Sequence, residues 1–176
     1  MNKTRFNLLA TTAFFLLGAT AVCAQLPSGV ATRQSDPLSH DPRKPNTYDL
    51  ENELRNAKIG RELESALKEG NDAFAAAPPR YAESERAFLR AVELEPKEAR
   101  AYLGLGIVYA AQNQVDKTVG AFKKAIEIKP KFAEAHFNLG MVYFAIGKKN
   151  EATEEYRVLA TLDQRLAKKL KDSIEK

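Results

Sequence analysis

A period of 34 residues in the second half of the chain limits the folds that it can adopt. Leucine, small, aromatic and proline residues recur at this spacing. The matched pairs are Leu105 with Leu139, Gly106 with Gly140, Tyr109 with Tyr143, Phe122 with Tyr156 and, one period earlier, Phe88 with Phe122, Ala91 with Ala125 and Pro96 with Pro130. A fixed period of this length is typical of repeat proteins built from stacked supersecondary units.

Each period contains two amphipathic stretches of about a dozen residues, the length of an ordinary helix. A pair of such helices cannot bury its apolar stripes alone, so neighbouring pairs must stack around a shared core. Gly106 and Gly140 lack side chains and let the paired helices approach closely. Pro96 and Pro130 cannot continue a helix and therefore end the units. The sequence predicts an all-α fold.

The pattern resembles the tetratricopeptide repeat family, whose 34-residue unit is a helix–turn–helix. The second repeat supplies the family's framework residues, with Thr118 in the place of the usual alanine: Tyr102, Leu105, Gly106, Tyr109, Phe122, Ala125 and Pro130. The third repeat has Leu159 in the place of the usual alanine and Gln164 in the place of the usual proline, with His136 at a framework position. The first repeat needs about two extra residues within 77–80. The resemblance covers residues 63–166 and implies a right-handed superhelical array of helix–turn–helix repeats.

Residues 1–24 have the features of a secretory signal peptide. Lys3 and Arg5 precede an apolar run, and Val22-Cys23-Ala24 places small residues before Gln25. The run is about a dozen residues long, shorter than the ~20 that span a bilayer, so we expect cleavage rather than a retained anchor. Lipidation at Cys23 is the alternative to cleavage after Ala24, although Val22 and Thr20 fit a lipoprotein signal poorly. Cleavage after Ala24 would leave no cysteine.

The remaining chain divides into further segments. Residues 25–47 contain four prolines without helical or strand periodicity, which predicts a flexible linker. We expect a leading helix at 48–62, repeats at 63–98, 99–132 and 133–162, and a capping helix at 163–176. The last segment carries apolar residues at four-residue steps: Leu162, Leu166, Leu170 and Ile174. Its lysines leave a membrane-surface helix as the alternative.

Charge and side-chain chemistry give no indication of catalysis. Without Lys3 and Arg5, 25 of the 27 basic residues remain against 23 acidic ones, a net charge of +2 that does not favour nucleic acid or membrane binding. His40 lies in the predicted linker and His136 at a framework position of the third repeat, so no histidine pair can form a metal site, and we expect His136 to be a structural residue. Gly104-Leu105-Gly106 lies within a helical pattern and lacks the preceding strand of a phosphate loop. We expect no enzymatic activity, no cofactor and no metal.

The resemblance places a partner-binding groove on the first helix of each repeat. The corresponding residues are mostly apolar: Leu67, Asn71, Phe74, Arg100, Leu103, Ile107, Glu134, Phe137, Asn138, Met141 and Phe144. Some family members clamp a partner's terminal carboxylate with cations, but only Asn71 matches that arrangement, so we do not expect a clamp. An external amphipathic helix or hydrophobic peptide could fill the groove. The chain's own leading helix or a second copy could also fill it.

The sequence therefore predicts an exported, non-enzymatic module for protein–protein contacts. Its expected location is the periplasm of a bacterium or the outside of the cell, and its expected partner is another polypeptide. An accessory subunit of an envelope enzyme complex and a lipid-anchored envelope assembly factor are the alternative functions.

Overall fold

A computed structural model describes residues 46–175 of the chain. This part consists of seven helices without a strand: α1 (Thr47–Ala75), α2 (Tyr81–Leu94), α3 (Ala99–Ala111), α4 (Val115–Ile128), α5 (Ala133–Ala145), α6 (Lys149–Leu162) and α7 (Gln164–Ile174). The predicted signal peptide and nearly all of the predicted linker lie outside the described residues. Asn46, the first described residue, caps α1 by accepting a hydrogen bond from the Tyr48 amide at 3.2 Å.

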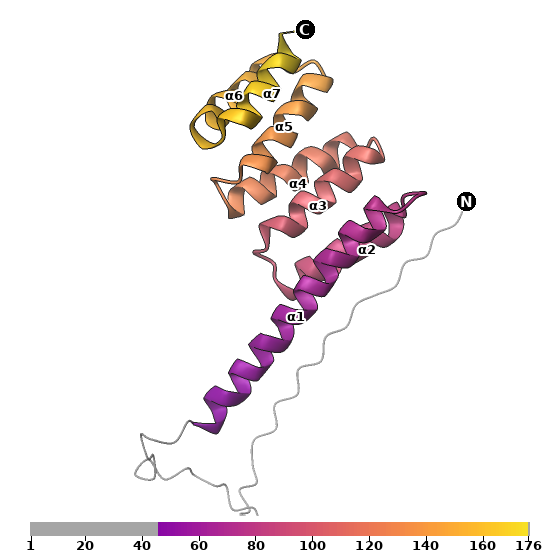
Figure 1. Cartoon of the computed structure of the whole chain (residues 1–176), viewed down its shortest axis with the longest axis vertical. Coiled ribbons are helices and arrows are strands. Elements are labelled where there is room, and N and C mark those ends of the chain that lie inside the picture. The colour runs from indigo at the N-terminus through magenta and orange to yellow at the C-terminus, as the bar shows by residue number, and fades with distance from the viewer. Residues whose placement is uncertain (1–45, 176) are drawn as a thin grey trace, which may run out of the picture. The chain divides into compact units, whose positions relative to one another are not determined.

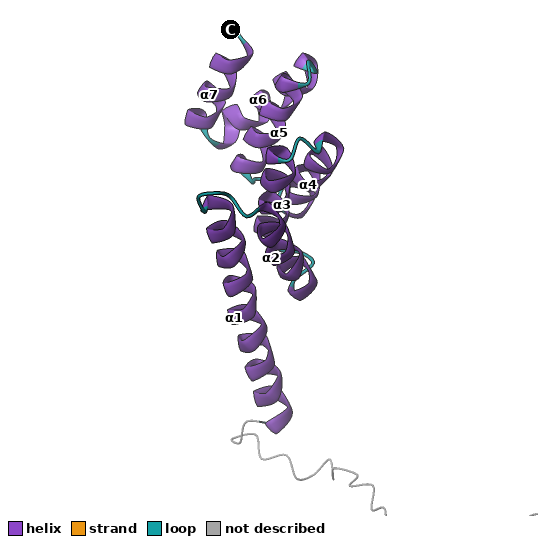
Figure 2. Cartoon of the chain, turned by 90° about the vertical axis from the view of Figure 1, so that its right-hand side faces the viewer, coloured by secondary structure: helices purple, strands orange, loops and turns teal. Residues whose placement is uncertain are grey.

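The helices pack as consecutive pairs, α1 with α2, α3 with α4 and α5 with α6 (Figure 1). The second helix of each pair contacts the first helix of the next, so the pairs stack in chain order. Figure 2 shows the same order of helices from the side. The predicted all-α array of helix–turn–helix repeats is confirmed.

The turns inside the second and third repeats have the same construction. Asn113 and Gly147 both adopt positive φ angles, 58° and 78°, a region that only glycine and asparagine enter readily. The next amide donates back to the preceding helix in both turns, from Gln114 to Tyr109 at 2.9 Å and from Lys148 to Tyr143 at 2.8 Å. The first repeat differs because five residues, 76–80, separate its helices, against three, 112–114, in the second.

Close contacts between the helices of a pair depend on small residues. A Cβ added at Gly106 would overlap the Phe122 ring, and the Phe88 ring lies in the same way against Gly70 and Gly104. Beside Phe88, the buried Ser84 hydroxyl donates to the Gly70 carbonyl at 2.7 Å and joins α2 to α1. Phe88 and Phe122 are 2% and 1% exposed, so each aromatic fills the space that the facing glycines leave.

α1 is a single helix of 29 residues. The expected leading helix and the first helix of the first repeat are parts of it, and the boundary expected at residues 62 and 63 falls in its interior. Its buried residues begin at Leu63 and continue to Ala73. The preceding part extends past α2 as an exposed helix (Figures 1 and 2).

α7 covers the end of the third repeat. Asp163 caps the helix by accepting hydrogen bonds from the amides of Arg165 and Leu166 at 2.9 and 3.1 Å. On its apolar side, Leu170 is fully buried in a cluster with Leu159, and a Cβ on Gly140 would lie 2.6 Å from Leu170. The apolar stripe of α7 therefore belongs to the core, as a capping helix requires.

Candidate protein-binding groove

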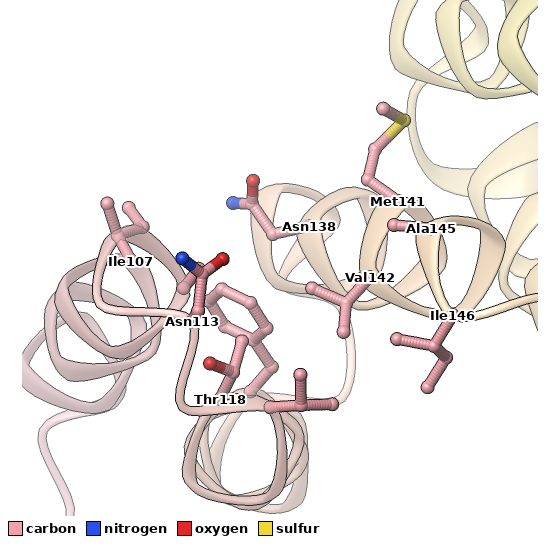
Figure 3. Close-up of a pocket in the computed structure, with 11 residues that line it drawn as sticks. Ile107, Asn113, Thr118, Asn138, Met141, Val142, Ala145 and Ile146 are labelled. Atoms are coloured by element: carbon pink, nitrogen blue, oxygen red, sulfur yellow. The ribbon is translucent and has the colours of Figure 1, made fainter.

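An open hollow of about 330 Å³ lies between the second and third repeats (Figure 3). We call it the apolar hollow. α3 supplies its first wall, the turn after α3 and the start of α4 supply its floor, and α5 supplies its second wall. Its lining residues are Ile107, Ala110, Asn113, Val115, Thr118, Phe122, Asn138, Met141, Val142, Ala145 and Ile146.

The lining of the apolar hollow carries no charge. Eight of the eleven residues are apolar, and the other three are Asn113, Thr118 and Asn138. The Thr118 hydroxyl already donates to the Gln114 carbonyl at 2.9 Å. The Asn138 amide nitrogen donates to the Glu134 carbonyl at 2.9 Å, which leaves its oxygen as an acceptor. Such a surface suits an apolar side chain with one hydrogen-bond donor beside it.

The rim of the apolar hollow exposes large apolar side chains. Val115, at the start of α4, is 40% exposed, and Ile146, directly after α5, is 38% exposed. Met141 and Val142 are half-buried on α5. Burying apolar surface of this kind against a partner would stabilise a complex by about 25 cal/mol per Å² before the costs of association.

Three predicted groove residues, Ile107, Asn138 and Met141, line the apolar hollow. Leu103, Phe137 and Phe144 are half-buried and pack partly against the cores of the second and third repeats. The side chains of these three predicted groove residues are therefore neither fully buried in the core nor fully exposed. Glu134, another predicted groove residue, is exposed.

Leu67, Asn71 and Arg100 line a separate hollow of about 370 Å³ between α1 and α3, which we call the polar hollow. Its other lining residues are Glu64, Lys68, Asp72 and Phe88. Leu67 is only 5% exposed and belongs to the core of the first two repeats. Phe74 packs on Tyr81 with ring centroids 5.9 Å apart. The structure thus divides the predicted groove residues among the two hollows and the cores.

Two carboxylates already hold Arg100. Its guanidinium donates to Glu98 at 2.9 and 3.0 Å and to Glu64 at 2.6 and 3.3 Å. The hydrogen bonds to Glu98 and Glu64 raise the pKa of Arg100 above its usual value. The side-chain hydrogen bond from Arg100 lowers the pKa of Glu98, with a smaller contribution from the Arg100 amide. Arg100 thus links α3 to α1, and its charge is balanced within the protein.

The sequence did not predict the contributions of α4 or of Val142 and Ile146 to the lining. Val115 and Thr118 come from the second helix of a repeat, whereas the predicted groove residues all come from first helices. Val142 and Ile146 follow Asn138 at steps of four residues and so lie on one face of α5. The available signal was Ile146 itself, which is apolar where Gln112 stands one period earlier.

His136 has the structural position that was expected of it. The ring is 6% exposed, with Nδ1 2.6 Å from a Glu155 carboxylate oxygen and Nε2 3.0 Å from the Pro130 carbonyl oxygen. These contacts join α5 to α6 and to the turn before α5. Among residues 46–175, no three His, Cys, Asp or Glu side chains gather where they could hold a metal ion. None of the helices in that range combines the length and apolar character needed to cross a membrane.

The fold and its groove define a helical repeat protein. Family models for the TPR repeat and the tetratricopeptide repeat match residues 108–147 and 133–165. Residues 108–165 are thus tetratricopeptide repeats, and the resemblance found in the sequence is confirmed. No curated protein matches the chain.

Solved structures of tetratricopeptide domains share the fold. The TPR domain of Arabidopsis OM64 is 17% identical with a TM-score of 0.61, over 66% of this chain and 97% of that domain. The TPR2B domain of yeast Sti1 in a pHsp70 complex is 20% identical with a TM-score of 0.60, over 65% of this chain and 97% of that domain. The second TPR domain of human RPAP3 in complex with an HSP70 peptide is 18% identical with a TM-score of 0.60, over 67% and 98%.

Proposed function

We propose that the protein is an exported protein–protein interaction module that holds a segment of another polypeptide in the apolar hollow. One observation carries the proposal: an uncharged, mostly apolar concavity of about 330 Å³ that opens between two stacked repeats. The RPAP3 domain was solved with an HSP70 peptide and the Sti1 domain in a pHsp70 complex, which supports the binding of polypeptide segments as a use of this fold.

The chemistry of the apolar hollow favours a partner that presents apolar side chains. A peptide ending in a carboxylate would find no cation among the lining residues of the apolar hollow. Arg100 is the one basic residue among the predicted groove residues, and Glu98 and Glu64 already hold it. The partner segment is therefore an amphipathic helix or an extended hydrophobic peptide, and a neutral donor on it can bond the Asn138 oxygen.

Binding through the apolar hollow can be tested with matched glutamate substitutions. Residues 25–176, wild type or Met141→Glu, are immobilised and exposed to an envelope extract, and captured proteins are identified by mass spectrometry. Leu89→Glu is the control, because Leu89 is 41% exposed on α2 and lies outside the apolar hollow. A synthetic peptide from the captured partner is then titrated against all three proteins.

The proposal expects the peptide to bind the wild type and Leu89→Glu equally and Met141→Glu at least ten times more weakly. A tenfold change corresponds to about 1.4 kcal/mol, a modest cost for placing a carboxylate against an apolar surface. Equal binding to all three proteins would show that the partner uses another surface.

Export is part of the proposal and rests on the pattern of residues 1–24. Mass spectrometry of the protein recovered from the envelope tests it directly. A free N-terminus at Gln25 supports export by a cleaved signal peptide. An acylated Cys23 would instead identify a lipid-anchored protein, and an intact Met1–Arg5 segment would contradict processing.

A further inference from the structure

The first half of α1 carries an apolar stripe that the other described helices leave open. Leu50 and Leu54 are 46% and 66% exposed, and Ala57 is exposed beside them. α1 packs only against α2 and α3 within residues 46–175, and its buried positions begin at Leu63. Exposed apolar side chains that adjoin one another on a helix mark a site of interaction with a partner or a risk of aggregation.

This stripe is distinct from the face that α1 packs into the core. At 100° per residue, Leu54 lies about 180° around the helix axis from Leu63, the first buried position. Leu50, Leu54 and Ala57 follow one another at steps of four and three residues and so share one side. α1 is therefore apolar on two opposite sides, and only one of them has a role in the repeat core.

The charges along residues 47–61 are separated into two blocks in the sequence. The acidic block is Asp49, Glu51 and Glu53, and the basic block is Arg55, Lys58 and Arg61. Lys58 lies 3.8 Å from Glu62 in an exposed pair, which holds the lysine only weakly. Residues 47–61 thus have no net charge but a strong polarity along the helix.

We propose that two copies of the chain associate through residues 47–61 as an antiparallel helix pair. Antiparallel pairing about Leu54 sets the acidic block of each copy beside the basic block of the other. Parallel pairing would set like charges together. The two-fold axis passes close to Leu54, where the two Leu54 side chains meet, and Leu50 of each copy packs near Ala57 of the other. Such an interface is closed, because both copies use the same surface.

The size of the surface sets the expected strength. Fifteen residues of helix are about 22 Å long, so the pair buries less than a typical stable interface. We therefore expect dissociation constants in the micromolar range. The interface leaves the apolar hollow free, because every residue that lines the hollow lies on α3, α4 or α5 or in a turn next to one of these helices. A dimer would then present two hollows to its partners, which raises the avidity for a multivalent target.

The first test measures mass against concentration. Sedimentation equilibrium on residues 25–176, from about 1 to 200 µM, brackets the affinity expected for a small interface. The wild type should pass from monomer to dimer, and Leu50→Glu/Leu54→Glu should weaken association at least tenfold. Leu89→Glu, at a leucine on α2 that is 41% exposed, should associate like the wild type. A wild type that stays monomeric at every concentration would overturn the proposal. It would also be overturned if Leu89→Glu weakened self-association as much as Leu50→Glu/Leu54→Glu.

Charge reversal tests the complementarity. Arg55→Glu/Lys58→Glu/Arg61→Glu makes the segment wholly acidic, and Asp49→Lys/Glu51→Lys/Glu53→Lys makes it wholly basic. Each variant alone should be at least tenfold weaker in self-association, and an equimolar mixture should form dimers again. Circular dichroism confirms that both keep their helix. Failure of the mixture to associate would contradict a charge-guided pair.

Disulfide trapping tests the orientation, since residues 25–176 contain no cysteine. An antiparallel pair about Leu54 sets position 47 of one copy beside position 61 of the other. Thr47→Cys mixed with Arg61→Cys should cross-link under mild oxidation, and neither variant alone should do so. Cross-linking of Thr47→Cys with itself would show a parallel pair and would overturn the proposed arrangement.

Discussion

Phe122 packs its ring directly against Gly106, at a distance that leaves no room for a Cβ on the glycine. The contact joins α3 to α4 and is the reason for the Leu-Gly element of the repeat. Phe122 is 1% exposed, so the ring cannot move aside into solvent. Any side chain at position 106 must push the two helices apart or distort the ring.

Substitution of Gly106 by alanine should therefore destabilise the protein by about 1–3 kcal/mol through overpacking. Gly120→Ala is a matched control, because Gly120 also lies inside a helix but has no atom within 4 Å of an added Cβ. The control should be neutral or up to about 1 kcal/mol more stable, from the better helix propensity of alanine. Urea unfolding midpoints measure both, and equal midpoints would contradict the close contact.

The cap formed by α7 gives a second prediction. Leu170 is fully buried against Leu159 and Gly140, so Leu170→Ala leaves a cavity and should cost about 2–5 kcal/mol. Leu89→Ala removes the same atoms from a half-exposed site and should cost much less. If thermal unfolding shows similar losses for both variants, α7 does not pack on the third repeat in solution.

The period of the sequence was sufficient to predict the helix pairs, because its glycine and aromatic positions mark where two helices meet, as Gly70 meets Phe88 and Gly106 meets Phe122. The third repeat differs, since Gly140 lies against Leu170 of α7. It could not predict the continuity of α1. Residues 59–63, Ile-Gly-Arg-Glu-Leu, contain no proline, and α1 continues through Gly60 without ending there. The change at Leu63 is only the point where α2 begins to cover the helix. Repeat boundaries follow packing, whereas helix ends follow local chemistry.

The groove was harder to predict than the fold. Equivalent positions have different surroundings, since Leu67 is 5% exposed while Leu103, in the same place of the next repeat, is half-buried. Leu67 lies in one cluster with Leu63, Phe88 and Leu105, so α2 and α3 both cover it. The lining from Val115 and Thr118 depends on how neighbouring repeats are offset, and no pattern within a single repeat contains that information.

The contact between His136 and Glu155 gives a third prediction. An aromatic residue is usual at this place in the family, yet here the ring bonds a carboxylate and the Pro130 carbonyl. His136→Phe should cost about 1–3 kcal/mol, because it leaves the partly buried Glu155 oxygen unpaired. The double variant His136→Phe/Glu155→Leu should recover most of this loss, since both polar partners are then replaced. A double-mutant cycle on urea unfolding gives the coupling, and strictly additive losses would contradict a direct contact.

The hydrogen bond from Arg100 to Glu98 predicts a pH dependence of stability. This bond lowers the pKa of Glu98 in the folded protein, while the unfolded chain has an ordinary glutamate with a pKa of about 4.3. A carboxylate whose pKa is lower in the folded protein than in the unfolded chain contributes its full stabilisation at pH values above the pKa of the unfolded chain. This contribution is lost as the pH falls through the pKa of the folded protein. The free energy of unfolding should therefore fall on acidification below about pH 4.3, and the fall should be smaller in Glu98→Gln.

Glu93→Gln, at an exposed position of α2, is the control and should follow the wild type. Urea midpoints at several pH values between about 2.5 and 6, spanning the ordinary glutamate pKa, measure the difference. If Glu98→Gln and the wild type lose stability in parallel over that range, the link between Glu98 and Arg100 does not contribute to folding.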